Sequence, residues 1–71
     1  MNTKSTKQES KDKKSIRTRE NIMRAARKVF SEHPYHTASM RMIGKEARIE
    51  HPLINYYFPN KAVLFETIVQ T

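Results

Sequence analysis

The chain has 71 residues, enough for one small domain whose core is near the lower limit for independent stability. It contains no cysteine, so disulfides cannot supplement that core, and this composition suits a reducing cytoplasm. Fourteen Lys and Arg against seven Asp and Glu give a formal charge of +7, which fits nucleic acid or an anionic membrane as a partner. No apolar run approaches the roughly 18 residues of a membrane span, and the N-terminus lacks the apolar segment of a signal peptide.

The first 14 residues contain no apolar residue after Met1 and carry five Lys against Glu9 and Asp12. Such a segment cannot offset its ordering entropy by burial, so we predict a disordered basic tail over residues 1–14. Two interpretations stay open for this tail: a solvated leader, or a basic arm that reaches phosphates in a neighbouring groove. The folded domain is expected over residues 15–71.

A first helix is predicted over residues 18–32, with Thr18 as its N-cap and Pro34 beyond its end. Its apolar residues recur with helical spacing and define one face: Ile22, Met23, Ala26, Val29 and Phe30. The opposite face carries Arg19, Arg24, Arg27 and Lys28. We expect most of these basic side chains to be solvated, and contact with a membrane or with phosphates is the alternative.

Two very short helices are predicted next. Ser39 is a suitable N-cap for a helix of about eight residues, in which Met40, Ile43 and Ala47 share a face. The only glycine, Gly44, lies inside this helix, where it costs roughly 1 kcal/mol of helix stability relative to alanine. A close approach of another helix, which a Cβ atom would block, explains why glycine stands there, so we predict a close crossing.

The next helix is predicted from His51 to about Tyr57, with Pro52 tolerated in its first turn and Pro59 ending it. Ile54 and Phe58 are spaced to face inward. A fourth helix, capped by Asn60, is predicted next. It carries an apolar stripe that should pack against another element: Leu64, Phe65, Ile68 and Val69. Phe30, Phe58 and Phe65 fit core positions, and Tyr35 is expected in the corner between helices. The predicted fold is therefore all-α, a three-helix bundle with a helix-turn-helix plus the start of a fourth helix.

Neither a metal site nor catalysis is expected. The histidines are His33, His36 and His51, and no pair has the i, i+4 spacing of a helical metal site. The chain has no phosphate-cradling glycine loop and no cysteine nucleophile, and it is too short to enclose a substrate. We therefore predict a protein without cofactor, metal or enzymatic activity.

The third predicted helix is the candidate for entering a major groove of duplex DNA. The side-chain amide of Asn55 offers a donor and an acceptor that match the major-groove edge of adenine, and the His51 ring can donate or accept a hydrogen bond according to its tautomer. Pro52 and Leu53 offer apolar surface that can contact a thymine methyl group. With Tyr56, the predicted base contacts are His51, Pro52, Leu53, Asn55 and Tyr56. The predicted phosphate contacts are Ser39, Arg41, Tyr57 and Lys61. A solvated polar surface is the alternative for each of these residues.

The ordered series of motifs resembles the N-terminal DNA-binding domain of the tetracycline-repressor (TetR) family. The resemblance covers residues 18–69 and rests on Ile22-x-x-x-Ala26-x-x-x-Phe30, Tyr35, Ser39-Met40-Arg41, Ile43, Ala47, Ile49, Tyr56-Tyr57-Phe58-Pro59-Asn60-Lys61 and Leu64. The family usually has glycine at Pro34 and Arg48, and often Ser at Glu50 and Tyr at Asn55. At Arg48, the turn between the short helices, a left-handed backbone would strain a non-glycine residue.

The resemblance implies the DNA-binding head of a transcriptional regulator, most often a repressor released by a small effector. In such families a C-terminal domain, absent from these 71 residues, dimerises and binds the effector. The implied partners are a near-palindromic DNA operator and, for the full-length protein, a second copy of itself. The alternatives are a basic amphipathic membrane-surface protein and a non-specific nucleic-acid binder.

Overall fold

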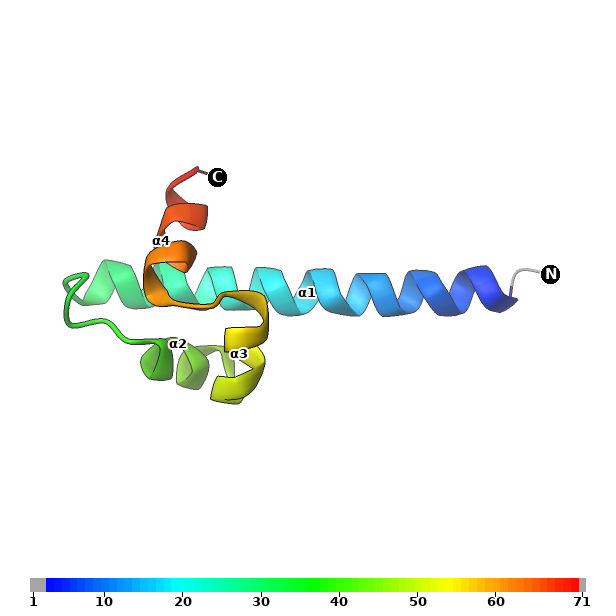
Figure 1. The fold of residues 1–71 in the computed structure, drawn as a ribbon, viewed down its shortest axis with the longest axis horizontal. Helices are drawn as coiled ribbons and strands as arrows, with labels where there is room; N and C mark the ends of the chain where they lie inside the picture. The colour runs from blue at the N-terminus through cyan, green and yellow to red at the C-terminus, as the bar shows by residue number, and fades with distance from the viewer. Residues whose placement is uncertain (1–2, 71) are drawn as a thin grey trace.

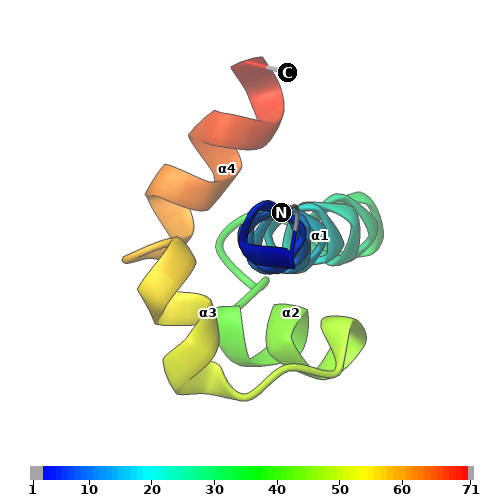
Figure 2. The ribbon, with the colours of Figure 1, turned by 90° about the vertical axis from the view of Figure 1, so that its right-hand side faces the viewer.

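The computed structural model describes the backbone of residues 3–70 and the side chains of residues 14–70. Its helices, in chain order, are α1 (Thr3–Glu32), α2 (Met40–Ala47), α3 (His51–Tyr57) and α4 (Lys61–Gln70). The described residues form helices and no strand, which confirms the predicted all-α fold. α1 forms a long rod, with α2 and α3 on one side of it and α4 running past it in a different direction (Figures 1 and 2).

α1 begins well before the predicted start. Thr18 was expected to cap it, but Thr18 lies inside the helix, where its hydroxyl donates to the Lys14 carbonyl at 2.9 Å. Residues 3–17 contain neither glycine nor proline, so nothing in their backbone interrupts a helix that is already nucleated by the packed segment. The side chains of residues 1–13 lie outside the described part of the chain, and the disorder of the tail over residues 1–14 stays a prediction.

The core is apolar and is shared by all four helices. Its largest fully buried side chains are Ile22, Ile43, Ile54, Phe58 and Leu64. Small residues of α1, Ala25 and Ala26, are fully buried as well, so the other helices approach its backbone closely. No described polar or charged residue is buried. The hydrophobic effect therefore holds the bundle together, at roughly 25 cal/mol for each Å² of apolar surface removed from water.

Gly44 lies where α2 and α3 approach each other. A Cβ atom at this position would be 2.8 Å from Ile54 Cδ1 and 3.0 Å from the Ile49 carbonyl oxygen. Both distances are shorter than ordinary van der Waals contact, so only glycine fits without a local shift. The close crossing predicted from the sequence is confirmed.

The turn between α2 and α3 is left-handed at Arg48, which has φ 60° and ψ 46°. Its N–H donates to the Lys45 carbonyl at 3.2 Å, and the next N–H, of Ile49, donates to the Gly44 carbonyl at 2.9 Å. These bonds satisfy the free carbonyls at the end of α2. The sequence left the handedness of this turn open; the structure shows that it is left-handed, so a residue with a side chain occupies a conformation that favours glycine.

The fourth helix is only partly covered. Asn60 caps it as predicted, since its Oδ1 accepts from the Val63 N–H at 2.9 Å. Leu64 is fully buried, but Phe65 is 38 % exposed and Val69 is 65 % exposed. The core position predicted for Phe65 is wrong in this respect, because α4 diverges from α1 (Figure 2) and leaves one side of Phe65 and most of Val69 open.

Candidate nucleic-acid interface

The candidate reading surface is the outer face of α3. Within this helix only Ile54 is buried, and Phe58 continues the buried side after the helix ends. All five predicted base-contacting residues are exposed: His51, Pro52, Leu53, Asn55 and Tyr56. Tyr56 in particular is wide open, with 80 % of its surface exposed. The short helix therefore presents one continuous face to a partner.

The helix-turn-helix holds this face in a fixed orientation. Ser39 caps α2, since its Oγ accepts from the Met42 N–H at 3.1 Å, and α2 buries Ile43 and Ala47. At α3, Glu50 stands at the N-cap position, but its side chain makes no capping hydrogen bond. The orientation of α3 therefore depends on the turn at Arg48 and on the burial of Ile54.

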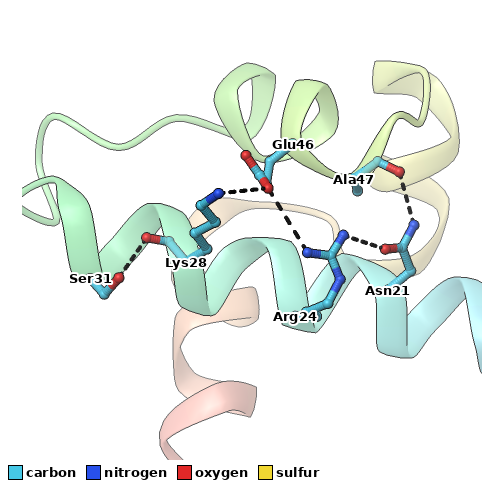
Figure 3. A network of polar contacts seen from close by, with 6 residues as sticks. All are labelled: Asn21, Arg24, Lys28, Ser31, Glu46 and Ala47. Carbon is cyan, nitrogen blue, oxygen red and sulfur yellow. Dashed lines mark hydrogen bonds and ion pairs between the residues drawn. The ribbon is translucent and has the colours of Figure 1, made fainter.

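A polar network that the sequence did not predict joins α1 to α2 (Figure 3). Asn21 Nδ2 donates to the Ala47 carbonyl at 2.9 Å, and Arg24 donates to Asn21 Oδ1 at 2.7 Å. Glu46 pairs with Arg24 at 3.9 Å and with Lys28 at 3.4 Å. Because Asn21 and Ala47 are 26 residues apart, helical periodicity gives no signal for this contact.

The basic face of α1 is exposed, as predicted, but its side chains are not simply solvated. Arg24 and Lys28 share Glu46, and the Arg19 guanidinium lies 5.3 Å from the centre of the Phe58 ring. The two ion pairs are largely open to water and contribute little to stability. Their main effect is to hold the positive charges of Arg24 and Lys28, on α1, next to Glu46 on α2.

The predicted phosphate-contacting residues differ in their surroundings. Arg41 is exposed, and Ser39 and Tyr57 are half-buried. The Lys61 ammonium donates to the carbonyls of Tyr35 at 2.7 Å and Ala38 at 2.9 Å, and lies 4.4 Å from the centre of the Tyr35 ring. Lys61 therefore links α4 to the loop before α2, a connection that sequence reasoning missed. An ammonium has three N–H donors, and these two bonds use two of them.

Aromatic rings gather beside this loop. Tyr35 stacks on Phe30 with a centroid distance of 5.8 Å, and Phe65 meets Tyr35 at 4.9 Å and Phe30 at 5.1 Å. Tyr35 thus lies in the corner between helices, as predicted, although it is 41 % exposed. The cluster fixes the loop that leads into α2.

In the described part of the chain, no three His, Cys, Asp or Glu residues come together in a way that would hold a metal ion. No described helix is long and apolar enough to cross a membrane.

Two short packed helices, joined by a left-handed turn and followed by an exposed helical face, define a helix-turn-helix protein. The sequence model for bacterial regulatory proteins of the tetR family matches residues 22–68, more than half of the chain. The chain therefore belongs to the TetR family, and its helix-turn-helix is the DNA-binding domain of a transcriptional regulator.

The similar curated proteins carry the name HTH-type transcriptional regulator UidR. The proteins of Escherichia coli K12, Escherichia coli O157:H7 and Shigella flexneri are each 38 % identical to this chain over 52 residues. The match covers 73 % of this chain and 26 % of each relative, so the chain spans about a quarter of their length. No solved structure matches the chain.

Proposed function

We propose that this chain reads duplex DNA sequence-specifically through the outer face of α3. The observation that carries the proposal is the exposure of all five predicted base-contacting residues on a helix whose only buried residue is Ile54. A helix presented in this way can enter a major groove, where each base pair displays a distinct pattern of donors and acceptors.

The side chains of this face suggest separate contacts. Asn55 offers the donor and acceptor pair that matches adenine, and His51 can donate or accept. Pro52 and Leu53 bring apolar surface to a thymine methyl group, and the exposed Tyr56 extends the face. We assign phosphate contacts to Ser39, Arg41, Tyr57 and Lys61, which flank the reading helix and would position it.

The proposal extends to the whole regulator. We infer a cytoplasmic repressor that forms a homodimer through a domain outside these residues and is released from DNA by a small effector. Two-fold symmetry would place the reading helices in successive major grooves, about 34 Å apart, on a near-palindromic operator. The effector would change that separation and so weaken binding.

Selection of bound duplexes from a random pool tests the reading function. We expect the 71-residue chain to enrich a short half-site motif, and the Tyr56→Ala and Asn55→Ala variants to change or weaken that motif. Thermal unfolding of the variants should match that of the parent chain, since both side chains are exposed. A pool that shows no enriched motif with the correctly folded chain would contradict the proposal.

A further inference from the structure

The turn residue Arg48 holds an unfavourable backbone conformation without using its side chain for folding. Among the described residues it alone has a positive φ, 60°, in a region that favours glycine. The hydrogen bonds that close the turn are made by the backbone N–H groups of Arg48 and Ile49. A glycine at position 48 would leave both bonds in place. Folding therefore does not explain why an arginine stands there.

The side chain of Arg48 is exposed and has no partner in the described part of the chain. It forms no hydrogen bond or ion pair there, and the carboxylate of Glu50, two residues later, does not pair with it. By contrast, Arg24 and Lys28 on α1 share Glu46 (Figure 3). Strained backbone conformations cluster at sites that bind ligands. The conformation of Arg48 and its unpaired guanidinium together indicate such a site.

Lys45 adds a second positive charge next to Arg48. The Arg48 N–H donates to the Lys45 carbonyl at 3.2 Å, so the two residues are joined through their backbones. Around α2, Gly44 faces Ile54 of α3, and Glu46 faces the cations of α1. At about 100° per residue, Lys45 lies about 100° from each of these contacts and therefore faces solvent. Its side chain is exposed and, among the described residues, has no ion pair.

Duplex DNA is the polyanion that this position would meet. Lys45 and Arg48 lie at the end of α2 that leads into α3, and Arg48 precedes His51, the first residue of α3, by three positions. In a helix-turn-helix, the helix before the reading helix crosses the DNA backbone. α3 contains neither Lys nor Arg, although neutralisation of phosphates supplies a large share of DNA affinity. Positive charge for the strand beside α3 must therefore come from its neighbours.

We propose that Arg48 and Lys45 bind phosphates of the DNA strand that flanks the bases contacted by α3, and we name these two residues the turn pair. The guanidinium can bind one phosphate through two parallel N–H···O bonds, and the ammonium acts as a point charge. This inference rests on the proposed reading function, since α3 determines where the duplex lies. It gives the strain at Arg48 a role, because the strained turn keeps the guanidinium beside the reading helix.

The Arg48→Gly variant separates DNA contact from folding. It removes the charge but relieves the turn, so it should unfold at no lower temperature than the intact chain. Any loss of binding then does not come from loss of the fold. Arg48→Ala and Lys45→Ala each remove one charge and keep a Cβ atom. Arg48→Lys keeps both the charge and the strained backbone but cannot form two parallel bonds to a phosphate.

Arg27→Ala is the matched control, because it removes the same charge from another exposed position. Arg27 lies about 120° around α1 from Asn21, the residue that bonds to the end of α2. A change that depends only on net charge should therefore appear in this variant as well. A change that depends on contact at the turn should not.

The measurement is the salt dependence of binding to the selected duplex. Arg48→Gly, Arg48→Ala and Lys45→Ala should each reduce the slope of log K against log salt by about 0.9, and Arg48→Ala combined with Lys45→Ala by about 1.8. Between about 50 and 200 mM salt, the intact chain should then lose about 12-fold more affinity than the double variant. Arg48→Lys and Arg27→Ala should keep the slope. Random duplexes should show the same reductions, since phosphates carry no sequence information directly.

Selected duplexes in which one phosphate is replaced by a neutral methylphosphonate locate the contact of Arg48. At one position beside the half-site, the replacement should weaken binding of the intact chain but cause no further loss in Arg48→Ala, because both changes remove the same interaction. If no position shows this coupling, Arg48 does not bind a phosphate and the proposal is wrong.

Unchanged slopes in Arg48→Gly and Lys45→Ala would overturn the inference. An equal reduction in Arg27→Ala would overturn it too, because the effect would then be one of net charge. A loss confined to the selected duplex would make Arg48 a base contact and not a phosphate contact. These results all leave the sequence preference of the intact chain in place. An intact chain without any preference would instead contradict the reading function, and the slopes on random duplexes would still test the turn pair.

Discussion

Arg48 is the residue at which sequence and backbone conflict most directly. Its left-handed conformation, φ 60°, forms the turn that sets α3 against α2. A residue with a Cβ atom adopts this conformation at a cost, and glycine does not. The hydrogen bonds of Arg48 and Ile49 to the end of α2 retain the turn in spite of that cost.

The Arg48→Gly substitution should raise the free energy of unfolding by something under about 1 kcal/mol, because relief of the strain exceeds the added entropy of the unfolded chain. Chemical denaturation measures this change. Arg48→Ala is the matched control, since it removes the same charge but keeps the Cβ atom, and it should give no such gain. A clear loss of stability in the glycine variant would show that the turn does not strain the residue.

The Asn55→Ala substitution should cost roughly 1–3 kcal/mol on the best duplex and relax specificity at one position of each half-site, because it removes a base-edge partner. Binding titrations on the selected duplex and on single-base variants of it measure both effects. The side chain is exposed, so folding should not change. Equal losses on selected and random duplexes would mean that Asn55 does not read a base.

At the scale of elements, Gly44 determines how closely α2 and α3 cross. The Gly44→Ala substitution should destabilise the fold by about 1–3 kcal/mol, because the new Cβ would press on Ile54 and on the Ile49 carbonyl, although alanine favours the helix itself. Thermal unfolding measures the loss. Lys45→Ala, at an exposed neighbouring position, is the control and should change stability by no more than about 0.5 kcal/mol. A more stable Gly44→Ala variant would show that the crossing can relax.

Arg41 and Lys61 allow a comparison between a side chain on α2 and one that links two elements. Each alanine variant should lower the salt slope of binding by about one, if each side chain contacts a phosphate. Lys61→Ala should also destabilise the fold, because it removes the bonds from α4 to the carbonyls of Tyr35 and Ala38. Titrations at several salt concentrations, together with thermal unfolding, separate the two effects. A slope unchanged in both variants would mean that neither side chain touches phosphate.

Local signals predicted the short elements well. The Ser39 cap, the length of α2, the bounds of α3 and the Asn60 cap each follow from residues next to one another in the chain. The same signals failed at the start of α1, because Thr18 has the residue type of a cap but lies inside a helix that no breaker interrupts.

Contacts between residues that are far apart in the chain could not be predicted from the sequence. The exposed positions of the reading face follow from the spacing around Ile54, so the surface of the candidate site was predictable. The bond from Asn21 to Ala47 and the bonds from Lys61 to the loop depend on how the helices pack, and nothing in the local pattern indicates them. Phe65 was misplaced for the same reason, since its exposure depends on the direction of α4.

At the scale of the molecule, this chain spans about a quarter of the length of its relatives. We propose that the reading heads are paired by residues outside it. The 71-residue chain should then bind an isolated half-site and a full palindrome with nearly equal affinity per head, whereas a paired protein should favour the palindrome by about 10²-fold or more. Titration of both duplexes measures this, with sedimentation of the chain alone as the control. Strongly cooperative binding of the palindrome by the 71-residue chain would place the pairing surface within these residues.

The burial pattern of α3 has a consequence for how such a protein acquires new targets. Ile54 is the only buried residue of the helix, so its outer positions can mutate with little effect on the free energy of unfolding. Selection can therefore vary the preferred DNA sequence almost independently of the scaffold that supports it. For the same reason, the outer face of α3 is a suitable region to randomise in a library of DNA-binding domains that recognise different operators. Gly44 and Ile54 would be held constant in such a library.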